Sequence, residues 1–363
     1  LNGSAECAVL TVPGVYRYLE EDLPLCVVAD VLTSHIGRKQ GLASRLLARS
    51  LAEAAAAGVP AAILGAFEQG YYDQLGFGTG SYDHWVGFDP AQLIVPARHR
   101  PPRRLALADG PAMLAARLER ARRHGAVNVL PPEHQQSEMV FTHNPFGLGY
   151  FDGPGGVLSH YIWCGASRME NGPYFVRWIV YRTREQFLEL MSVIRSLGDQ
   201  VRLFKMLEPP DVQLQDLLRW PFKQRQITEH SPYESGIQAR AWWQMRILDL
   251  GRCLARTHLP GDPLRFNLRL SDPIERYLEP DSPWHGVAGD YVVTLGPASA
   301  AEPGLDESLP TLSTTVNAFT RLWIGVQPAG GLAMTDELNA PPELLGALDA
   351  LLRLPRPLPF WEF

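Results

Sequence analysis

The sequence predicts two layered α/β units followed by a smaller α+β unit, and three observations support this class. Residues 5–88 alternate apolar strand-like runs with amphipathic helical segments, in the order β–loop–α–β–α–β. Residues 104–218 repeat the alternation, and from about Ala241 the strands and helices become shorter and more mixed. Alternating strands and helices favour a sheet with crossover helices packed on its faces.

The length of the chain indicates more than one domain. Its 363 residues exceed a single typical core, so two or three domains are expected. The proline- and arginine-rich stretch 90–102 is typical of a solvated linker. We therefore predict three domains, over residues 1–92, 93–240 and 241–363.

Charge and cysteine usage exclude several classes of protein. A net charge of −6 argues against a nucleic-acid binder. The four cysteines lack the spacing of a zinc site or a disulfide framework, so we expect no metal and a reducing, cytoplasmic compartment. No apolar run is long enough to span a membrane, and no signal peptide is visible.

The first domain is predicted to contain one long helix, one short helix and several strands. The long helix, 42–57, carries a leucine and alanine stripe on one face, and Gly58 and Pro60 end it. The other elements expected here are strands at 7–12, 15–19, 25–33, 61–66 and 81–88 and a short helix within 68–77.

The later domains are predicted from the same patterns. The second has strands expected at 104–108, 148–151, 157–163, 174–181 and 201–206 and helices at 109–123, 184–197 and 212–218. The third has strands expected at 243–248, 265–270, 291–295 and around Leu332 and helices at 249–257 and 342–352. The second domain has no glycine loop like that of the first, so it is predicted to hold no cofactor.

A glycine-punctuated turn between Thr33 and Leu42 is the main candidate site. Its spacing is Arg38-x-x-Gly41-x-Ala43, and no proline interrupts it, so every amide there can donate a hydrogen bond. Glycine lets a ligand approach the backbone, and the start of a helix favours an anion. The pattern is neither of the two common nucleotide loops. The alternative is an ordinary strand-to-helix turn with basic surface residues.

The turn resembles the acyl-CoA pyrophosphate loop of the GCN5-related N-acetyltransferases, whose pattern is Gln/Arg-x-x-Gly-x-Gly/Ala. About thirty residues later, Tyr72-x-x-Leu-Gly-Phe77 resembles a second segment of these enzymes. With its three units and its final Glu-Phe, the chain resembles the enhanced-intracellular-survival family of bacterial N-acetyltransferases. The resemblance implies tandem acetyltransferase-like domains with mixed sheets, followed by a domain similar to sterol carrier proteins.

The resemblance also implies a reaction and the residues that serve it. The reaction is transfer of an acetyl group from acetyl-CoA to a primary amine of the lysine, polyamine or aminoglycoside type, by a homotrimer or homohexamer. Tyr72 is the implied general acid, and the carboxylate of the last residue, Phe363, is the implied general base. The implied cofactor-binding residues are Val31, Leu32, Thr33, Arg38, Lys39, Gly41, Leu42 and Ala43.

The sequence departs from the family at two places. The chain starts late for this family, so the first domain is expected to be N-terminally truncated, which puts the amine preference in doubt. A serine common in the family after the strand 61–66 is replaced by Phe67 or a neighbour. Glu362 and Trp361 are the candidate substrate residues, with an exposed glutamate and a core tryptophan as their alternatives.

The chemistry leaves alternatives open. The phenol of Tyr72 can protonate a departing thiolate, because the two pKa values differ little. Equally, Tyr72 can be a packing residue while Tyr71 is the exposed one. A rival function is a lipid or small-molecule carrier, or an interaction module, that uses the third domain.

Overall fold

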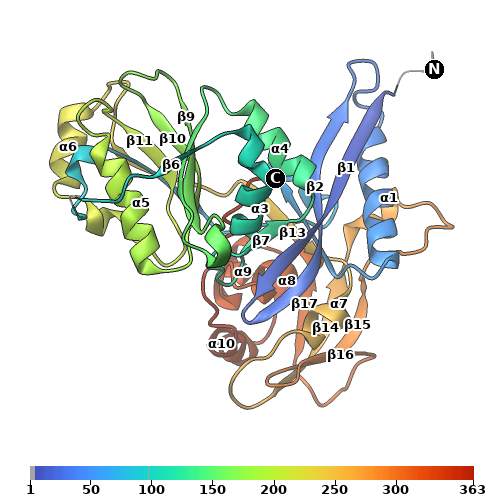
Figure 1. Cartoon of the computed structure of the whole chain (residues 1–363). Coiled ribbons are helices and arrows are strands. Elements are labelled where there is room, and N and C mark those ends of the chain that lie inside the picture. The colour runs from blue at the N-terminus through green and yellow to red at the C-terminus, as the bar shows by residue number, and fades with distance from the viewer. Residues whose placement is uncertain (1–4, 97) are drawn as a thin grey trace. The chain divides into compact units, whose positions relative to one another are not determined.

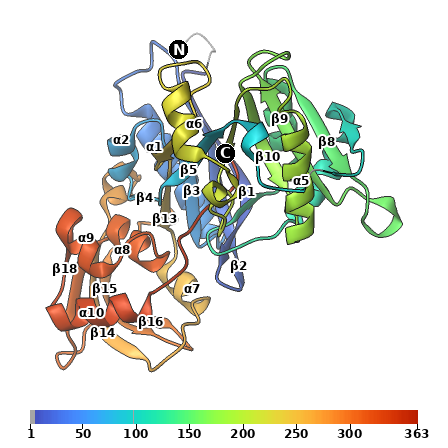
Figure 2. The same cartoon turned by 90° about the vertical axis from the view of Figure 1, so that its left-hand side faces the viewer.

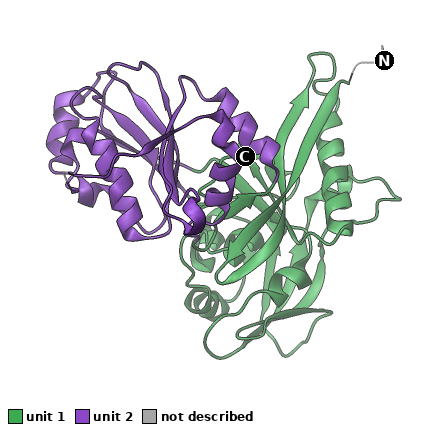
Figure 3. Ribbon diagram, in the orientation of Figure 1, with its two compact units in different colours: residues 1–81, 123–130, 241–363 green, residues 82–122, 131–240 purple. Residues whose placement is uncertain are grey.

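A computed structural model describes residues 5–96 and 98–363 of the chain, and these form two compact units. Unit 1 combines three segments, 1–81, 123–130 and 241–363, and unit 2 comprises 82–122 and 131–240 (Figure 3). Both units are therefore discontinuous in sequence. They differ from the three predicted domains, because the predicted third domain is part of the same compact unit as the first.

Unit 1 contains a six-stranded sheet with the strand order β4-β13-β3-β2-β1-β7. β1 and β2 form a long antiparallel pair, and β2 and β3 run parallel. The bounds of its strands are β1 (Cys7–Tyr18), β2 (Glu21–Thr33), β3 (Ala61–Gly65), β4 (Gly78–Thr79), β7 (Val127–Val129) and β13 (Trp243–Ile247).

Helix α1 (Leu42–Ala56) covers this sheet. Its buried face includes Leu47 and Leu51, which belong to the same core cluster as Val28 and Leu64 of the strands. The helix lies beside β1 and β2 in Figure 1. The predicted leucine stripe is thus confirmed. Because this face is buried against the sheet, α1 begins at a fixed place, directly after the turn that follows β2.

A β-bulge in β2 separates it from β3. The pairing of β1 with β2 skips one residue, because Leu10 faces Asp30 while Thr11 faces Val28, which leaves Ala29 as the extra residue. A bulged strand bends. Pairing of β2 with β3 ends at Val28 opposite Leu64, whereas β2 continues to Thr33. Among the described residues no strand pairs with β2 on that side beyond Val28, so the two parallel strands diverge.

The two units exchange one strand each. β13, which follows unit 2 in the chain, pairs with β3 and β4 of unit 1. β5 (Asp83–Phe88), which follows β4, pairs with β11 and β12 of unit 2. This exchange explains why the predicted domain limit at residue 92 differs from the observed one at residue 81. The sequence assigns each strand to a domain by its place along the chain, so β5 is placed in the first predicted domain and β13 in the third.

Unit 2 contains a seven-stranded sheet with the order β12-β5-β11-β10-β9-β8-β6. Its further strands are β6 (Arg103–Leu105), β8 (Phe146–Tyr150), β9 (His160–Ala166), β10 (Tyr174–Val180), β11 (Phe204–Leu207) and β12 (Gly236–Arg240). Its helices are α3 (Gly110–Leu118), α4 (Pro132–Phe141), α5 (Arg184–Ser196) and α6 (Pro221–Thr228). α4, α6 and β12 were not predicted, since polar residues dominate their sequences.

A five-stranded mixed sheet, β16-β15-β14-β17-β18, completes unit 1. Figure 2 shows this sheet with α8, α9 and α10 in the orange-to-red part of the chain. β14 and β15 match the predicted strands 265–270 and 291–295 and pair antiparallel, but Leu332 lies in α9 and not in a strand. The bounds are β14 (Leu264–Ser271), β15 (Gly289–Leu295), β16 (Ala300–Pro303), β17 (Thr311–Thr315), β18 (Leu338–Asn339), α7 (Leu250–Ala255), α8 (Val316–Trp323), α9 (Ala329–Thr335) and α10 (Pro342–Leu351).

Candidate functional site

The turn between β2 and α1 presents a row of free amides. Within the described chain, the N–H groups of residues 38–43 donate no hydrogen bond to another residue. α1 has no side-chain cap and no acidic residue in its first turn. The residue before the helix, Gly41, has a left-handed φ of 71°, and a Cβ there would meet open space. The amide row (residues 38–43) is therefore an anion-binding concavity at the positive end of a 15-residue helix.

Local contacts hold the turn in shape without using these amides. The Ser34 hydroxyl donates to the Glu6 carboxylate and accepts from the Gly37 N–H at 3.1 Å. The Gln40 side chain donates to the Ile36 carbonyl at 2.7 Å. Arg38 and Lys39 are exposed. Preorganised donors and two free cations together suit a phosphate or pyrophosphate group.

The predicted cofactor residues of the strand lie on the divergent end of β2. Val31, Leu32 and Thr33 follow the bulge at Ala29 and pair only with β1 among the described strands. On the side that faces β3, the backbone N–H and C=O groups of these residues are therefore available to an extended ligand. Such a ligand would form hydrogen bonds with them as an added strand does. The bulge is the feature that sequence reasoning missed, because Ala29 carries no bulge signal of its own.

The matching helix of unit 2 lacks such a row. The hydroxyl of Thr183, the residue before α5, accepts from the Gln186 N–H, while the Gln186 side chain accepts from the Arg182 N–H at 2.8 Å. Glu185 adds a carboxylate in the first turn. This capping occupies the N–H groups of Arg182 and Gln186, and the Glu185 carboxylate repels an anion. The structure thus gives a physical reason for the prediction that the second α/β unit holds no cofactor.

Tyr72 is buried in α2 (Gln69–Asp73), the short helix after β3. Its ring contacts Phe67 and Phe77 edge to face, at centroid distances of 5.7 and 6.3 Å. Among the described residues, no acceptor forms a hydrogen bond with the Tyr72 hydroxyl. Burial, with a smaller contribution from the neighbouring Tyr71 phenol, raises the pKa of Tyr72 to about 12. The phenol is therefore protonated at neutral pH.

Tyr71 is half-buried and engaged. Its oxygen accepts a hydrogen bond from the Ser44 hydroxyl of α1 at 3.1 Å. Burial raises the pKa of Tyr71, which the Ser44 bond partly offsets. Tyr71 thus links α2 to the first turn of α1, next to the amide row. Tyr72 is the more buried of the two, as the alternative interpretation required. Its burial also keeps the phenol protonated at neutral pH, which a proton donor requires.

The end of the chain lies against the end of β3. A Cβ at Gly65 would lie 3.0 Å from the main-chain oxygen of Phe363 and 3.1 Å from the Trp242 ring. The rings of Trp242 and Phe363 are 5.1 Å apart. β3 ends at Gly65, where it has diverged from β2, so the chain end borders the divergent region.

The candidate substrate residue Trp361 has a different setting. Its side chain is 2% exposed and packs in the interior of unit 1, so it does not line an open pocket in this structure. The half-buried Trp242 takes the bordering position instead. Glu362 is half-buried. Sequence reasoning offers Trp242 and Trp243 as a pair that can line a pocket, with core packing as the alternative, and in the structure the Trp242 ring lies beside that of Phe363.

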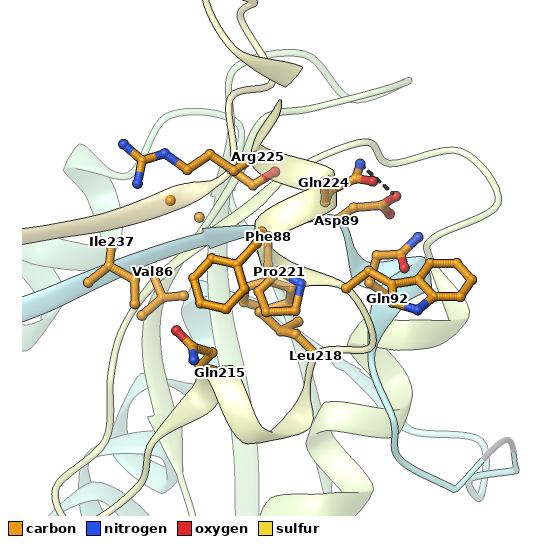
Figure 4. A pocket seen from close by; sticks show the side chains of 15 residues that line it. Val86, Phe88, Asp89, Gln92, Gln215, Leu218, Pro221, Gln224, Arg225 and Ile237 are labelled. Atoms are coloured by element: carbon orange, nitrogen blue, oxygen red, sulfur yellow. Dashed lines mark hydrogen bonds between the residues drawn. The ribbon is translucent and has the colours of Figure 1, made fainter. Parts of the chain in front are cut away.

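Unit 2 carries an apolar groove of about 130 Å³ between β5, β12 and α6 (Figure 4). Val86, Phe88 and Ile237 contribute to its walls. Its one carboxylate, Asp89, already accepts from the Ala91 N–H and from Gln224, at 2.9 and 3.4 Å. The groove thus offers apolar contact and no free amide row, which does not suit a pyrophosphate.

Unit 2 also holds an acidic and histidine cluster. Asp152, His160 and Glu189 have ligand atoms within 4.8 Å of one another. The Arg100 guanidinium, however, binds both carboxylates, at 2.7 Å to Asp152 and 2.6 Å to Glu189. This hydrogen bonding lowers the pKa of Glu189 to about 2. The cluster is an ion-pair network, in which a metal ion would have to displace Arg100.

Comparison with protein families agrees with the geometry. Residues 14–80 match the family model described as an acetyltransferase (GNAT) domain. These residues contain the bulge, the amide row and Tyr72. The prediction of an acetyltransferase enzyme is thus confirmed at the level of this domain, and GNAT domains use acetyl-CoA as cosubstrate. A comparison with curated proteins finds no match.

Solved structures share the fold of the whole chain. Eis1 from Mycobacterium abscessus is similar with a TM-score of 0.76 at 18% identity, over 100% of this chain and 89% of that one. A conserved protein of Enterococcus faecalis V583, described as a probable N-acyltransferase, has a TM-score of 0.75 at 17% identity, over 100% and 88%. A GCN5-related N-acetyltransferase from Kribbella flavida has a TM-score of 0.73 at 17% identity, over 100% and 85%.

These similarities support the mixed α/β fold, while the resemblance of residues 241–363 to sterol carriers stays a prediction. The helices of the described residues, 5–96 and 98–363, include none with the length and apolar character needed to cross a membrane.

Gly41→Ala is expected to weaken acetyl-CoA binding. A left-handed alanine costs about 1–2 kcal/mol, so the turn relaxes and its amides no longer converge. We expect an affinity loss of about five- to tenfold by calorimetry. Gly155→Ala is the matched control, since Gly155 has a φ of 74° and equally open surroundings in unit 2. Equal acetyl-CoA affinity in the two variants would contradict the assignment of the turn.

Proposed function

We propose that the chain is an acetyl-CoA-dependent N-acetyltransferase that acts on a primary amine by direct attack. The observation that carries the proposal is the amide row at residues 38–43, placed where β2 diverges from β3. Its donors, with Arg38 and Lys39, fit the pyrophosphate of acetyl-CoA. The free edge of Val31 to Thr33 fits the extended pantetheine arm. Leu42 and Ala43 belong to the same set, as the first residues of α1.

The residues around the divergent strands have separate roles. Bound acetyl-CoA supplies an activated acetyl thioester. The amine nitrogen forms a bond to the acetyl carbon while the carbon–sulfur bond breaks, and the products are an amide and free CoA. Backbone N–H groups near Thr33 can donate to the carbonyl oxygen as it gains charge. Tyr72 gives its proton to the departing thiolate. Its phenol holds that proton at neutral pH, but a pKa of about 12 widens the gap to the thiol, whose usual pKa is about 8.5, so the transfer is uphill by about three pKa units.

The proton lost by the amine requires an acceptor. We propose the terminal carboxylate of Phe363, directly or through a water molecule. The contact of the Phe363 main chain with Gly65, at the open end of β3, supports this role. A carboxylate is a weak base in water and a stronger one where it is desolvated; Phe363 is half-buried, with its ring against that of Trp242. Glu362 stays a candidate for attracting a cationic amine.

The rival function of a lipid carrier has less support. The open cavity on the five-stranded sheet, of about 800 Å³, has the charged side chains of Arg269, Asp290 and Glu337 on its walls. An apolar ligand that filled it would have to desolvate these charges, which is costly. A lysine, polyamine or aminoglycoside amine, a cytoplasmic location and a trimeric or hexameric assembly complete the proposal.

Tyr72→Phe is expected to lower kcat about 100-fold, since general acid catalysis typically contributes that much or more. The affinity for acetyl-CoA is expected to stay within about twofold, because the phenol does not contact the amide row. With a pKa of about 12, Tyr72 is protonated throughout pH 6–10, so its ionisation adds no fall in kcat in that range. Steady-state kinetics over a panel of primary amines test this. An unchanged kcat would reject Tyr72 as the acid.

Extending the chain by one glycine after Phe363 is expected to lower kcat more than tenfold. The extension replaces the carboxylate at Phe363 by a neutral amide and moves the charge by one residue, about 3.5 Å. A Phe363→Leu variant retains the carboxylate and is the matched control, with a smaller loss expected. Equal kcat in the extended and natural chains would show that the terminal carboxylate is not the base.

A further inference from the structure

The helix that carries Tyr72 is too short to hold its own position. α2 has five residues, and only the Glu68 carboxylate caps its start, by accepting from the Gly70 and Tyr71 N–H groups. A helix of one turn is not stable in isolation. Side chains outside the segment 61–81 must therefore fix the direction of the Tyr72 phenol.

Asn317 of α8 fastens the end of α2. Its side-chain amide donates to the carbonyls of Asp73 and Phe77, both at 2.8 Å. These two acceptors lie on either side of Gly76, so one side chain closes the turn that follows Tyr72. Gly78 permits this close approach, because a Cβ there would collide with the Asn317 carbonyl.

Two further side chains reach α2 from β13. Gln244, fully buried, donates to the Asp73 carboxylate at 2.6 Å and to Thr79 at 3.1 Å. Arg246, also fully buried, donates to the Leu75 carbonyl. Both side chains thus hold the turn on the side of α2 that faces β13.

A buried ion pair fixes Arg246 in turn. Its guanidinium lies 2.7 Å from the Asp272 carboxylate, and both side chains are fully buried. Asp272 also accepts from the Ile274 and Val287 N–H groups, at 3.1 and 3.0 Å. The guanidinium would lie 2.6 Å from a Cβ at Gly76, so glycine at this position of the motif makes room for it.

We infer that Asn317, Gln244 and Arg246 are positioning residues for the general acid Tyr72. The inference rests on the proposed function and deepens it. All three side chains come from the segment that sequence analysis separates as a third domain. Each bonds to the segment around the turn after Tyr72, and the hydrogen bonds of these three side chains to described residues do not reach the amide row.

The test is a double-mutant cycle on the full chain with Asn317→Ala and Tyr72→Phe. Loss of two bonds to the turn allows the phenol to move, and a displacement of about 1 Å can cost up to a hundredfold in rate. We expect Asn317→Ala to lower kcat at least tenfold with lysine, spermidine or kanamycin as acceptor. The acetyl-CoA dissociation constant is expected to change less than threefold. On the Tyr72→Phe background, the further loss is expected to be below twofold.

Asn267→Ala is the matched control. The Asn267 side chain likewise donates to two backbone carbonyls, those of Asp306 and Leu309, at 2.7 and 3.1 Å, but it belongs to β14. It is expected to lower the melting temperature without lowering kcat. Equal kcat losses in the two asparagine variants, or full additivity with Tyr72→Phe, would overturn the inference.

A second readout separates the inference from the proposed function. If the natural chain acetylates none of the amines, the proposed function fails, and 3-fluorotyrosine placed at position 72 still reports the setting of the phenol. Asn317→Ala is expected to shift or broaden its ¹⁹F resonance, and Asn267→Ala is expected to leave it unchanged. An unaltered resonance in Asn317→Ala would overturn the inference independently of turnover.

Discussion

Unsatisfied backbone N–H groups at the start of α1 are the constraint on which this structure depends. Six consecutive amides, residues 38–43, have no acceptor among the described residues. An exposed turn can leave them to water, but here the turn is shaped by Ser34 and Gln40, and Gly41 has a left-handed φ. The bulge at Ala29 bends β2 away from β3 beside them. Amide row and free strand edge together form one elongated binding surface.

The contrast between the two α/β units shows that the fold alone does not create this surface. Both units place a helix after a strand that pairs with a parallel neighbour. In unit 2, the side chains of Thr183 and Gln186 accept from the Gln186 and Arg182 N–H groups, whereas α1 of unit 1 has no side-chain cap. The chemistry of a few residues before the helix therefore decides which unit can bind an anion, while the sheet only sets the place.

Local patterns in the sequence predicted the main elements of unit 1 and the turn. The leucine stripe of α1, the strand ending at Thr33 and the spacing of Arg38, Gly41 and Ala43 are all local properties, so they could be read directly. The exchange of β5 and β13 could not be predicted, because pairing partners 116 to 186 residues apart leave no local pattern. For the same reason the sequence named Trp242 only as part of an aromatic pair, and it gave Trp361, which is 2% exposed in the structure, as a candidate substrate residue.

The Tyr72 motif illustrates the difference further. Its glycine was expected to end a short helix, and it does so with a φ of 84°. The structure adds a second reason, since Gly76 also makes room for the Arg246 guanidinium. That constraint arises from a residue 170 positions later, and the sequence around Tyr72 contains no sign of it.

Amide hydrogen exchange with and without acetyl-CoA tests the central claim most directly. If the amide row holds the pyrophosphate, exchange at residues 38–43 slows at least tenfold on saturation, while exchange at the capped start of α5, residues 183–186, does not change. Unchanged exchange at residues 38–43, or protection confined to residues 183–186, would contradict the assignment of the site.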